Sequence, residues 1–221
     1  MTALALAMVV AAGTAAAPTV RLEPDPATPG VVTVTTGFER ALLPLSVGVA
    51  FGLDAAQRPL ALGVELTMPL LQPDLQDLRG RVWATWDLDT DSGWLVRPCF
   101  GLYGITTTND AFTASGLGAQ LGGLAGYSSQ RWLVGAELVG NVTIVEYLTT
   151  TPYARRMGSP TTGVTLWGAA YGFQAGARAG VLLGPIELSV RAGFDRKGKY
   201  NLAIPPAYVT VGAGVRWGGA R

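Results

Sequence analysis

The side chains of this sequence with the clearest capacity for chemistry are arginines and carboxylates set at alternate positions of apolar segments. Arg79 and Arg81 alternate in this way in one segment, and Glu187, Arg191 and Asp195 do so in another. The chain has no histidine, which is the side chain that most naturally transfers protons near neutral pH. A Ser-His-Asp arrangement is therefore excluded, and no motif marks a pair of catalytic carboxylates. We expect no catalytic residue and predict that the protein is not an enzyme.

One segment has the spacing with which a calcium-binding loop begins. The segment 87–93 carries aspartates at alternate positions followed by serine and glycine, but the glycine comes one residue late. Pro98 stands where the bidentate glutamate of such a loop belongs. Aspartate and serine are also ordinary turn residues, and a single cysteine excludes a cysteine-rich zinc site. We therefore predict a tight turn here, no metal and no cofactor.

The composition limits which class of protein this chain can be. Of its 221 residues, 49% are hydrophobic and 14% are charged, whereas typical soluble domains have about 25% charged residues. Such a chain has too few charges to cover a water-facing surface. Its net charge of +1 gives no reason to expect nucleic acid as a partner.

The beginning of the sequence has the pattern of a secretory signal peptide. An apolar run over residues 3–12 is followed by the small residues of 13–17, which is the arrangement of a hydrophobic region and cleavage site. No basic residue precedes the run, and a buried N-terminal helix is the alternative. We predict a signal peptide over 1–17, a proline-rich extended tail over 18–30, and a barrel domain over 31–218.

From residue 31 onward, apolar residues recur at every second position, which indicates strands with one apolar face. In the segment 60–70 the even positions are leucine, valine or methionine, while Gly63, Glu65 and Thr67 lie on the other face. Short connections alternate with mostly longer ones, as in transmembrane barrels. We predict an all-β fold, a single antiparallel transmembrane β-barrel of ten strands, with eight strands as the alternative. The candidate strands are about 31–39, 43–53, 59–70, 77–89, 93–107, 113–128, 131–148, 163–183, 185–196 and 206–217.

One of these segments also imitates a membrane-spanning helix. Glycines recur at every fourth residue from Gly168 to Gly180, as in the small-residue motif of helix pairs. A helix would turn Arg178 toward lipid, whereas a strand places it on the face opposite Trp167 and Tyr171. We therefore favour a strand over 163–183.

Three features indicate that the apolar faces meet lipid rather than a buried core. The opposite faces consist mainly of small residues with a few charges, and the only two lysines, Lys197 and Lys199, lie in one predicted loop. Aromatic residues lie near strand ends on the apolar face, as in the interfacial girdle of membrane barrels. The predicted girdle comprises Trp86, Trp94, Tyr127, Trp132, Phe194 and Trp217.

With its signal-like start, its ten alternating segments and its last strand, Tyr208–Trp217, the chain resembles small Gram-negative outer-membrane β-barrel proteins of the OmpA-like or OmpW-like size class. The last strand is similar to the signal read by the barrel-assembly machinery. That family usually ends on its aromatic residue, whereas residues 218–221 follow Trp217 here. The resemblance implies a bacterial outer-membrane location, with membrane lipid, lipopolysaccharide and the assembly machinery as partners. It identifies no envelope protein partner.

If the apolar faces meet lipid, the charged side chains on the opposite faces point into the lumen. We predict a mixed-charge network, with arginines bridging carboxylates because buried charges must be paired or solvated. We expect five of these charges, Glu65, Arg97, Glu137, Arg178 and Arg191, to lie at similar heights, with Gln174 and Asn141 nearby. The full predicted set is Glu65, Arg79, Arg81, Asp87, Arg97, Glu137, Arg178, Glu187, Arg191, Asp195 and Arg216.

The predicted function follows from this filled lumen. We expect a non-enzymatic barrel that serves envelope integrity or presents surface loops. A narrow passive pore for small solutes or ions is the first alternative, and a secreted soluble β-barrel that binds a hydrophobic ligand is the second. The loops with Arg155, Arg156, Lys197 and Lys199 are candidates for contact with lipopolysaccharide phosphates, which cationic side chains bind well, although they also fit simple solvated loops.

Overall fold

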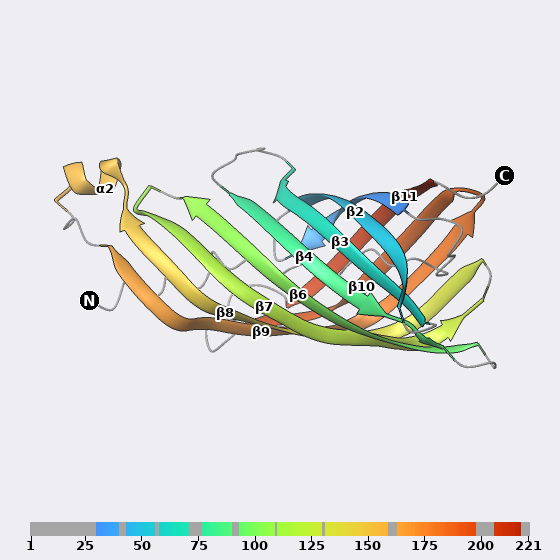
Figure 1. Ribbon diagram of the computed structural model, residues 1–221. Coiled ribbons are helices and arrows are strands. Elements are labelled where there is room, and N and C mark those ends of the chain that lie inside the picture. Colours follow the sequence, from blue (N-terminus) through green and yellow to red (C-terminus); the bar gives the residue numbers. More distant parts are fainter. Residues whose placement is uncertain are drawn as a thin grey trace.

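Antiparallel pairing of neighbouring strands closes this chain into a barrel (Figure 1). The computed structural model describes residues 30–39, 43–55, 58–70, 77–89, 93–108, 110–129, 131–158, 163–197 and 206–217. The predicted signal peptide, almost all of the predicted tail and residue 218 lie outside these ranges. The strands are β1 (Gly30–Glu39), β2 (Pro44–Ala55), β3 (Arg58–Pro69), β4 (Leu78–Trp86), β5 (Leu88–Asp89), β6 (Trp94–Thr108), β7 (Phe112–Ser128), β8 (Trp132–Thr150), β9 (Val164–Leu183), β10 (Ile186–Lys197) and β11 (Ala207–Trp217).

The ring of strands is sealed by β1, which pairs with β2 on one side and with β11 on the other. At the opposite point of the ring β4 pairs with β6, and β5 continues the line of β4 against the start of β6. Together β4 and β5 take the place of one predicted strand, so the prediction of a ten-stranded all-β antiparallel barrel is confirmed. The observed strand ends lie within about two residues of the predicted ones.

The gap between β4 and β5 has a cause on the neighbouring strand. Thr85 pairs with Cys99 and Leu88 pairs with Val96, so the register continues unchanged across the gap. In this register Pro98 lies opposite Trp86, the last residue before the gap, and its backbone nitrogen carries no hydrogen to donate to the ladder. The interruption is therefore a local loss of hydrogen bonding within one continuous strand.

Side chains alternate between a charged interior and an apolar exterior. On β4, Val82 is 50% exposed while its neighbour Arg81 is 3% exposed. On β10, Phe194 is 67% exposed while Asp195 is fully buried. A soluble barrel that binds a hydrophobic ligand requires the reverse arrangement, so the second functional alternative is contradicted.

The strands are strongly staggered around the ring. Following the paired residues from Glu65 through β4, β6, β7 and β8 leads to Ala170 on β9. The opposite route through β2, β1, β11 and β10 leads to Leu182. The two routes therefore reach β9 at positions about 12 residues apart. This offset means that the strands tilt relative to the barrel axis. Directly paired positions on successive strands therefore lie at progressively different levels in the lumen.

Strands β7, β8 and β9 are the longest and extend past the rest of the rim (Figure 1). The pairing of β8 is irregular around Ile144 on both sides, and β9 carries Gly168 with a φ of +59° at the same level. These bulges lie where Figure 1 shows β8 and β9 bending away from the barrel wall. Segment 163–183 is a strand, as predicted, with Gly172, Gly176 and Gly180 on its inward face.

A short helix, α2 (Pro152–Arg156), follows β8 within the predicted long loop. Thr151 caps it: its hydroxyl accepts a hydrogen bond from the N–H of Ala154 at 3.2 Å, and proline opens the first turn. The alternation that revealed the strands carries no signal for so short a helix. No helix in the described ranges is both long enough and apolar enough to cross a membrane.

Candidate functional site in the barrel lumen

All eleven charged side chains that the sequence placed in the lumen are buried inside the barrel in the structure. The most exposed of them, Arg216, shows 8% of its surface, and Asp195 shows none. The carboxylates and arginines come from β3, β4, β6, β8, β9, β10 and β11, together with Asp87 in the gap between β4 and β5. They form several ion pairs and hydrogen-bonded groups, which differ in geometry and in the strands that they connect.

Arg97 and Asp87 form a two-pronged ion pair near the end of the barrel with the short turns. The Arg97 Nη2 donates to Asp87 Oδ2 at 2.6 Å, and its Nε donates to Oδ1 of the same carboxylate. Asp87 lies opposite Arg97 in the continued register of β4, β5 and β6. The parallel geometry of this pair is that of strong Arg–carboxylate recognition.

Arg81 joins three strands. Its Nη2 lies 2.7 Å from Oε2 of Glu65, its cross-strand partner on β3, and its Nη1 donates to Oε1 of Gln120 on β7 at 3.1 Å. Glu65 also accepts a hydrogen bond from the Thr67 hydroxyl at 3.3 Å. Because β4 and β7 are separated by β6, the bond to Gln120 spans the inner face of β6.

Glu137 on β8 accepts hydrogen bonds from two non-adjacent strands, over the inner face of the strands between them. Arg191 on β10 donates its Nε to both carboxylate oxygens, at 2.8 and 3.0 Å, and its Nη2 lies 2.6 Å from Oε1. The Tyr208 hydroxyl of β11 donates to Oε1 at 2.7 Å. The Arg191 guanidinium lies 5.4 Å from the centre of the Tyr208 ring, a distance at which cation and ring attract each other.

Two glycines make the contact between Tyr208 and Glu137 sterically feasible. Tyr208, Gly193, Gly176 and Glu137 follow one another in a single cross-strand row from β11 to β8. A Cβ atom on either glycine would collide with the Tyr208 hydroxyl. The ring therefore lies across two strands in space that only glycine leaves open. In the same way, the ring of Trp83 lies over Gly63 and the ring of Tyr103 lies over Gly118.

The remaining predicted charges lie around this centre. Arg216 Nη2 is 3.3 Å from Glu187 Oε2, and Arg178 lies directly opposite Arg191 in the register of β9 and β10. Arg178 interacts electrostatically with both Glu137 and Glu187. Two cations face each other here with carboxylates close to both. Asp195 lies opposite Gln174, and Arg79 lies 4.5 Å from the centre of the Tyr103 ring.

Electrostatic contacts link several of the five charges that were expected at similar heights. Glu137, Arg178 and Arg191 lie together, and Arg97 also interacts electrostatically with Arg178. Glu65 has its own partner in Arg81, and Arg97 has its own partner in Asp87. Sequence reasoning also missed Tyr208, Tyr103 and Gln120 as members of the network, because their partners are defined only by cross-strand register.

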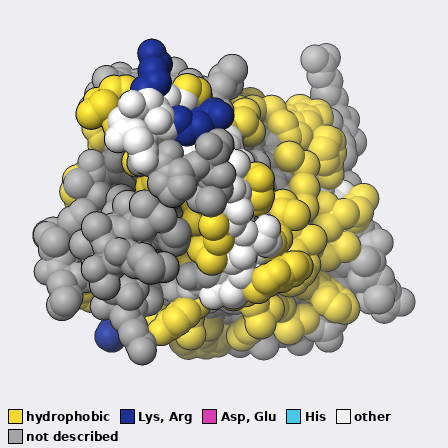
Figure 2. All heavy atoms as spheres, turned by 90° about the vertical axis from the view of Figure 1, so that its left-hand side faces the viewer, with side chains coloured by type: hydrophobic (Ala, Val, Ile, Leu, Met, Phe, Trp, Pro, Cys, Tyr) yellow, Lys and Arg dark blue, Asp and Glu magenta, His cyan; other side chains and the backbone are white. Residues whose placement is uncertain are grey.

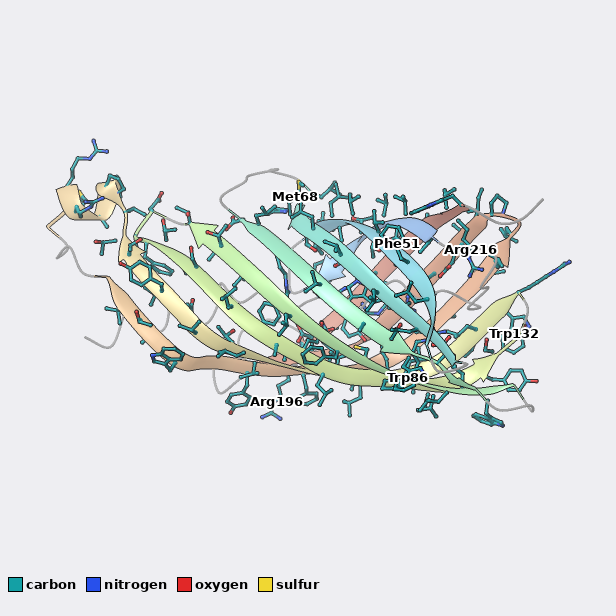
Figure 3. The ribbon with its side chains drawn as sticks, in the orientation of Figure 1. Phe51, Met68, Trp86, Trp132, Arg196 and Arg216 are labelled. Atoms are coloured by element: carbon teal, nitrogen blue, oxygen red, sulfur yellow. The ribbon has the colours of Figure 1, made fainter. Side chains whose placement is uncertain are left out.

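Five of the six predicted girdle aromatics lie at the end with the short turns. Trp94 and Tyr127 pack edge to face with centroids 6.1 Å apart, and Tyr127 stacks on Trp132 at 5.4 Å. Trp217 packs against Phe51, and Figure 3 shows Trp86 and Trp132 outside the ribbon near this end. Phe194 instead lies toward the far end of β10. Other strongly exposed aromatics on neighbouring β9 are Trp167 (76%), Tyr171 (61%) and Phe173 (43%).

The predicted basic loop residues are partly described. Arg155 and Arg156 are exposed on α2, and Figure 2 shows basic side chains at the top of the end where the long strands project. Lys197 ends β10, while Lys199 lies outside the described residues. Arg196 is exposed beside it and points away from the barrel (Figure 3).

Among the described residues, no three of His, Cys, Asp and Glu gather as ligands of a metal ion would. Cys99 is buried with its thiol free of any disulfide. The described lumen side chains form ion pairs and hydrogen bonds between arginine, carboxylate, amide and phenol groups.

A closed antiparallel ring of tilted strands, apolar outside and charged inside, defines a class of protein. It is the transmembrane β-barrel of bacterial outer membranes. The aromatic cluster at one end marks an interface between the apolar belt and water.

No protein-family model and no curated protein matches the sequence. Among solved structures, the chain is similar to the beta domain of the Bordetella autotransporter BrkA, with 13% identity and a TM-score of 0.36 over 86% of this chain and 99% of that one. It is also similar to Neisserial surface protein A, with 11% identity and a TM-score of 0.32 over 85% of this chain and 96% of that one. A third similar structure is the transport unit of the autotransporter AIDA-I from Escherichia coli, with 11% identity and a TM-score of 0.35 over 97% of each chain. The class is defined by this chain's own strand pairing and side-chain directions.

Proposed function

We propose that this protein is a non-enzymatic outer-membrane barrel whose lumen is closed by its own ion pairs. The observation that carries the proposal is the bonding of Glu137 to Arg191 and Tyr208, which joins β8 to β10 and β11 over the inner face of the strands between them. The bond from Arg81 to Gln120 spans the inner face of β6 in the same way. Side chains that bridge non-adjacent strands fill space inside the barrel and narrow the path that a solute would take.

A closed barrel serves through its outer surface and its loops. We therefore propose a role in envelope integrity or in surface interaction, with membrane lipid surrounding the apolar belt. The exposed Arg155 and Arg156 suit contact with the phosphates of lipopolysaccharide. The strand Tyr208–Trp217, which seals the ring, is the segment that we expect the assembly machinery to recognise.

A narrow pore is the second candidate, because several buried polar atoms have no hydrogen-bond partner among the residues that the structure describes. They include Nη1 of Arg97, Nδ2 of Asn141 and Nε of Arg216. Buried polar groups normally find a partner in protein or water. Water that reached all three positions would form part of a hydrated path.

Conductance across a planar bilayer separates the two candidates. We expect the refolded wild type to insert without current steps, and Glu137→Gln to produce steps because Arg191 and Tyr208 lose their shared anchor. Arg156→Gln, on α2 outside the lumen, is the matched control and should stay silent. Steady wild-type conductance whose ion selectivity changes when Arg97 is reversed to glutamate would refute closure and establish the pore.

A further inference from the structure

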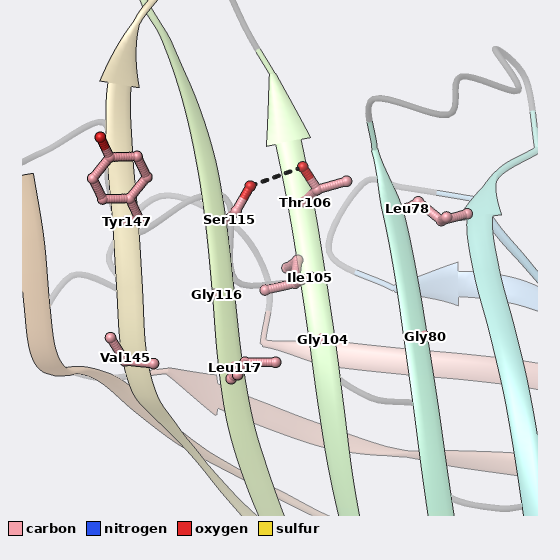
Figure 4. Close-up of a pocket in the computed structure, with 10 residues that line it drawn as sticks. All are labelled: Leu78, Gly80, Gly104, Ile105, Thr106, Ser115, Gly116, Leu117, Val145 and Tyr147. Atoms are coloured by element: carbon pink, nitrogen blue, oxygen red, sulfur yellow. Dashed lines mark hydrogen bonds between the residues drawn. The ribbon is translucent and has the colours of Figure 1, made fainter. Parts of the chain in front are cut away.

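A groove of about 520 Å³ hollows the outer face of the barrel toward the end with the long connections (Figure 4). It spans β4, β6, β7 and β8, and its outward-facing positions form two neighbouring rows across these strands. The first row is Gly80, Gly104, Leu117 and Val145, and the second is Leu78, Thr106, Ser115 and Tyr147.

The floor of the groove consists of two glycines that the barrel itself does not require. Gly80 and Gly104 are direct cross-strand partners, and neither has a positive φ. A Cβ atom on Gly80 would meet no heavy atom within 4 Å, and one on Gly104 would meet Leu117 at an ordinary 3.6 Å. Inward glycines such as Gly63 make room for a ring. Glycine weakens a strand, and no contact within the described barrel requires it at these two positions, where it leaves a hollow.

The groove interrupts a continuous apolar belt. In the row of the two glycines, Leu66 follows on β3 and Leu117 on β7, with exposed fractions of 41% and 61%. Val82 and Leu102, one row closer to the short turns, are 50% and 46% exposed. The two leucines stand three strand spacings apart, or about 14 Å. The hollow between them is open to whatever covers the rest of the belt, which in this class of protein is lipid.

Polarity rises along the groove toward the loops. The hydroxyls of Thr106 and Ser115 lie 3.2 Å apart and are exposed, and Tyr147 is 50% exposed in the same row. Further along the chain, β8 leads to α2 with the exposed Arg155 and Arg156. The apolar floor is thus followed by a pair of hydroxyls and then by cations. A lipid has the matching order, with a hydrocarbon chain, a polar linkage and an anionic headgroup.

We propose that this groove holds one acyl chain of a membrane lipid, with its headgroup directed toward Thr106 and Ser115. An unbranched hydrocarbon chain fits a flat glycine floor better than a branched side chain does, because it needs no matching pockets. The site is independent of whether the lumen is closed, since it lies on the opposite face of the same strands.

Native mass spectrometry of the refolded barrel with dimyristoylphosphatidylglycerol tests the site. We expect the wild type to retain one lipid that the variant carrying Gly80→Leu and Gly104→Leu loses, with affinity lowered at least about tenfold. Gly140→Leu is the matched control: this glycine faces outward on β8 beside Leu121 and Phe173, away from the groove. A Cβ there meets its nearest atom at 3.7 Å.

Each variant is first checked for folding by circular dichroism and by the shift of its electrophoretic mobility on heating. Lipid retention by the folded variants then supports or refutes the lipid site. Equal lipid retention by wild type, the double leucine variant and Gly140→Leu would overturn the proposal. So would a wild-type dimer that the double variant abolishes, because the groove would then hold a second copy. If the leucine variant does not fold, Gly80→Ala with Gly104→Ala fills less space and should lower retention partially, whereas unchanged retention refutes the site.

Discussion

Glu137 holds three strands together through one carboxylate. It accepts hydrogen bonds from Arg191 on β10 and Tyr208 on β11 while lying on β8. All three side chains are nearly fully buried. A charge in such a place is tolerated only because its partner is fixed beside it.

Replacing Glu137 by glutamine leaves the Arg191 charge buried without its counter-charge. We expect the free energy of unfolding to fall by about 3–5 kcal/mol, the range for breaking a buried ion pair. Urea unfolding in lipid vesicles, followed by tryptophan fluorescence, measures this loss. The exposed Arg156→Gln should change stability by no more than about 0.5 kcal/mol. A similarly small effect of Glu137→Gln would mean that the pair contributes nothing to the fold.

The inward direction of each charge could be predicted from the sequence, but its partner could not. Alternation along one strand is a local property, and it placed Glu137 and Arg191 on the inward face. The partner of Arg97 depends on how far each strand is displaced against the next, which no single segment records. The same limit hid Tyr208, whose role depends on Gly193 and Gly176 lying between it and Glu137.

At the scale of the elements, the cap of α2 ties the projecting tip together. The Thr151 hydroxyl accepts a hydrogen bond from the Ala154 N–H at 3.2 Å and donates to the backbone oxygen of Asp110 on the neighbouring connection. One side chain therefore orders both α2 and its attachment to the tip of the β6–β7 connection.

Thr151→Ala should loosen this tip without affecting the barrel. Loss of an N-cap costs about 1 kcal/mol, which corresponds to roughly a fivefold larger open population. We expect trypsin to cleave after Arg155 and Arg156 about fivefold faster, with the thermal unfolding of the barrel unchanged. Thr151→Ser keeps the hydroxyl and should behave as wild type. Equal cleavage of all three proteins would show that the cap does not order the tip.

The extents of the strands follow from the sequence because period-two alternation and turn residues are local signals. The irregularities do not. Pro98 was visible, but its effect falls on the neighbouring strand, where it separates β4 from β5. The bulge at Ile144 and the positive φ of Gly168 arise where two long strands must bend together, and alternation alone does not reveal them.

At the scale of the whole molecule, the barrel depends on one seam. β1 and β11 pair over ten residues, from Gly30 with Trp217 to Glu39 with Tyr208. The seam joins the two ends of the described chain, and no other strand can replace either partner without changing the register of the ring.

A disulfide across the seam tests this register. Val32 and Val215 are direct partners on the outer face, so Val32→Cys with Val215→Cys, in a Cys99→Ser background, should cross-link on oxidation because paired Cβ atoms lie within about 5.5 Å. The denatured chain would then run as a ring on an electrophoresis gel, with a mobility that reductant restores. Val32→Cys with Val209→Cys is the register control, since Val209 pairs with Phe38. Equal cross-linking of both variants would refute the seam as described.

The same seam governs the order of events in the protein's biogenesis. Gly30 cannot meet its partner until Trp217 has been synthesised, so the ring closes only after every strand of the barrel has been made. Contacts between residues so distant in sequence form slowly, and until they form both edge strands present open backbone to other chains. The interval between translation and closure is therefore the period of greatest aggregation risk, and the cell must protect the unfolded chain throughout its journey to the membrane.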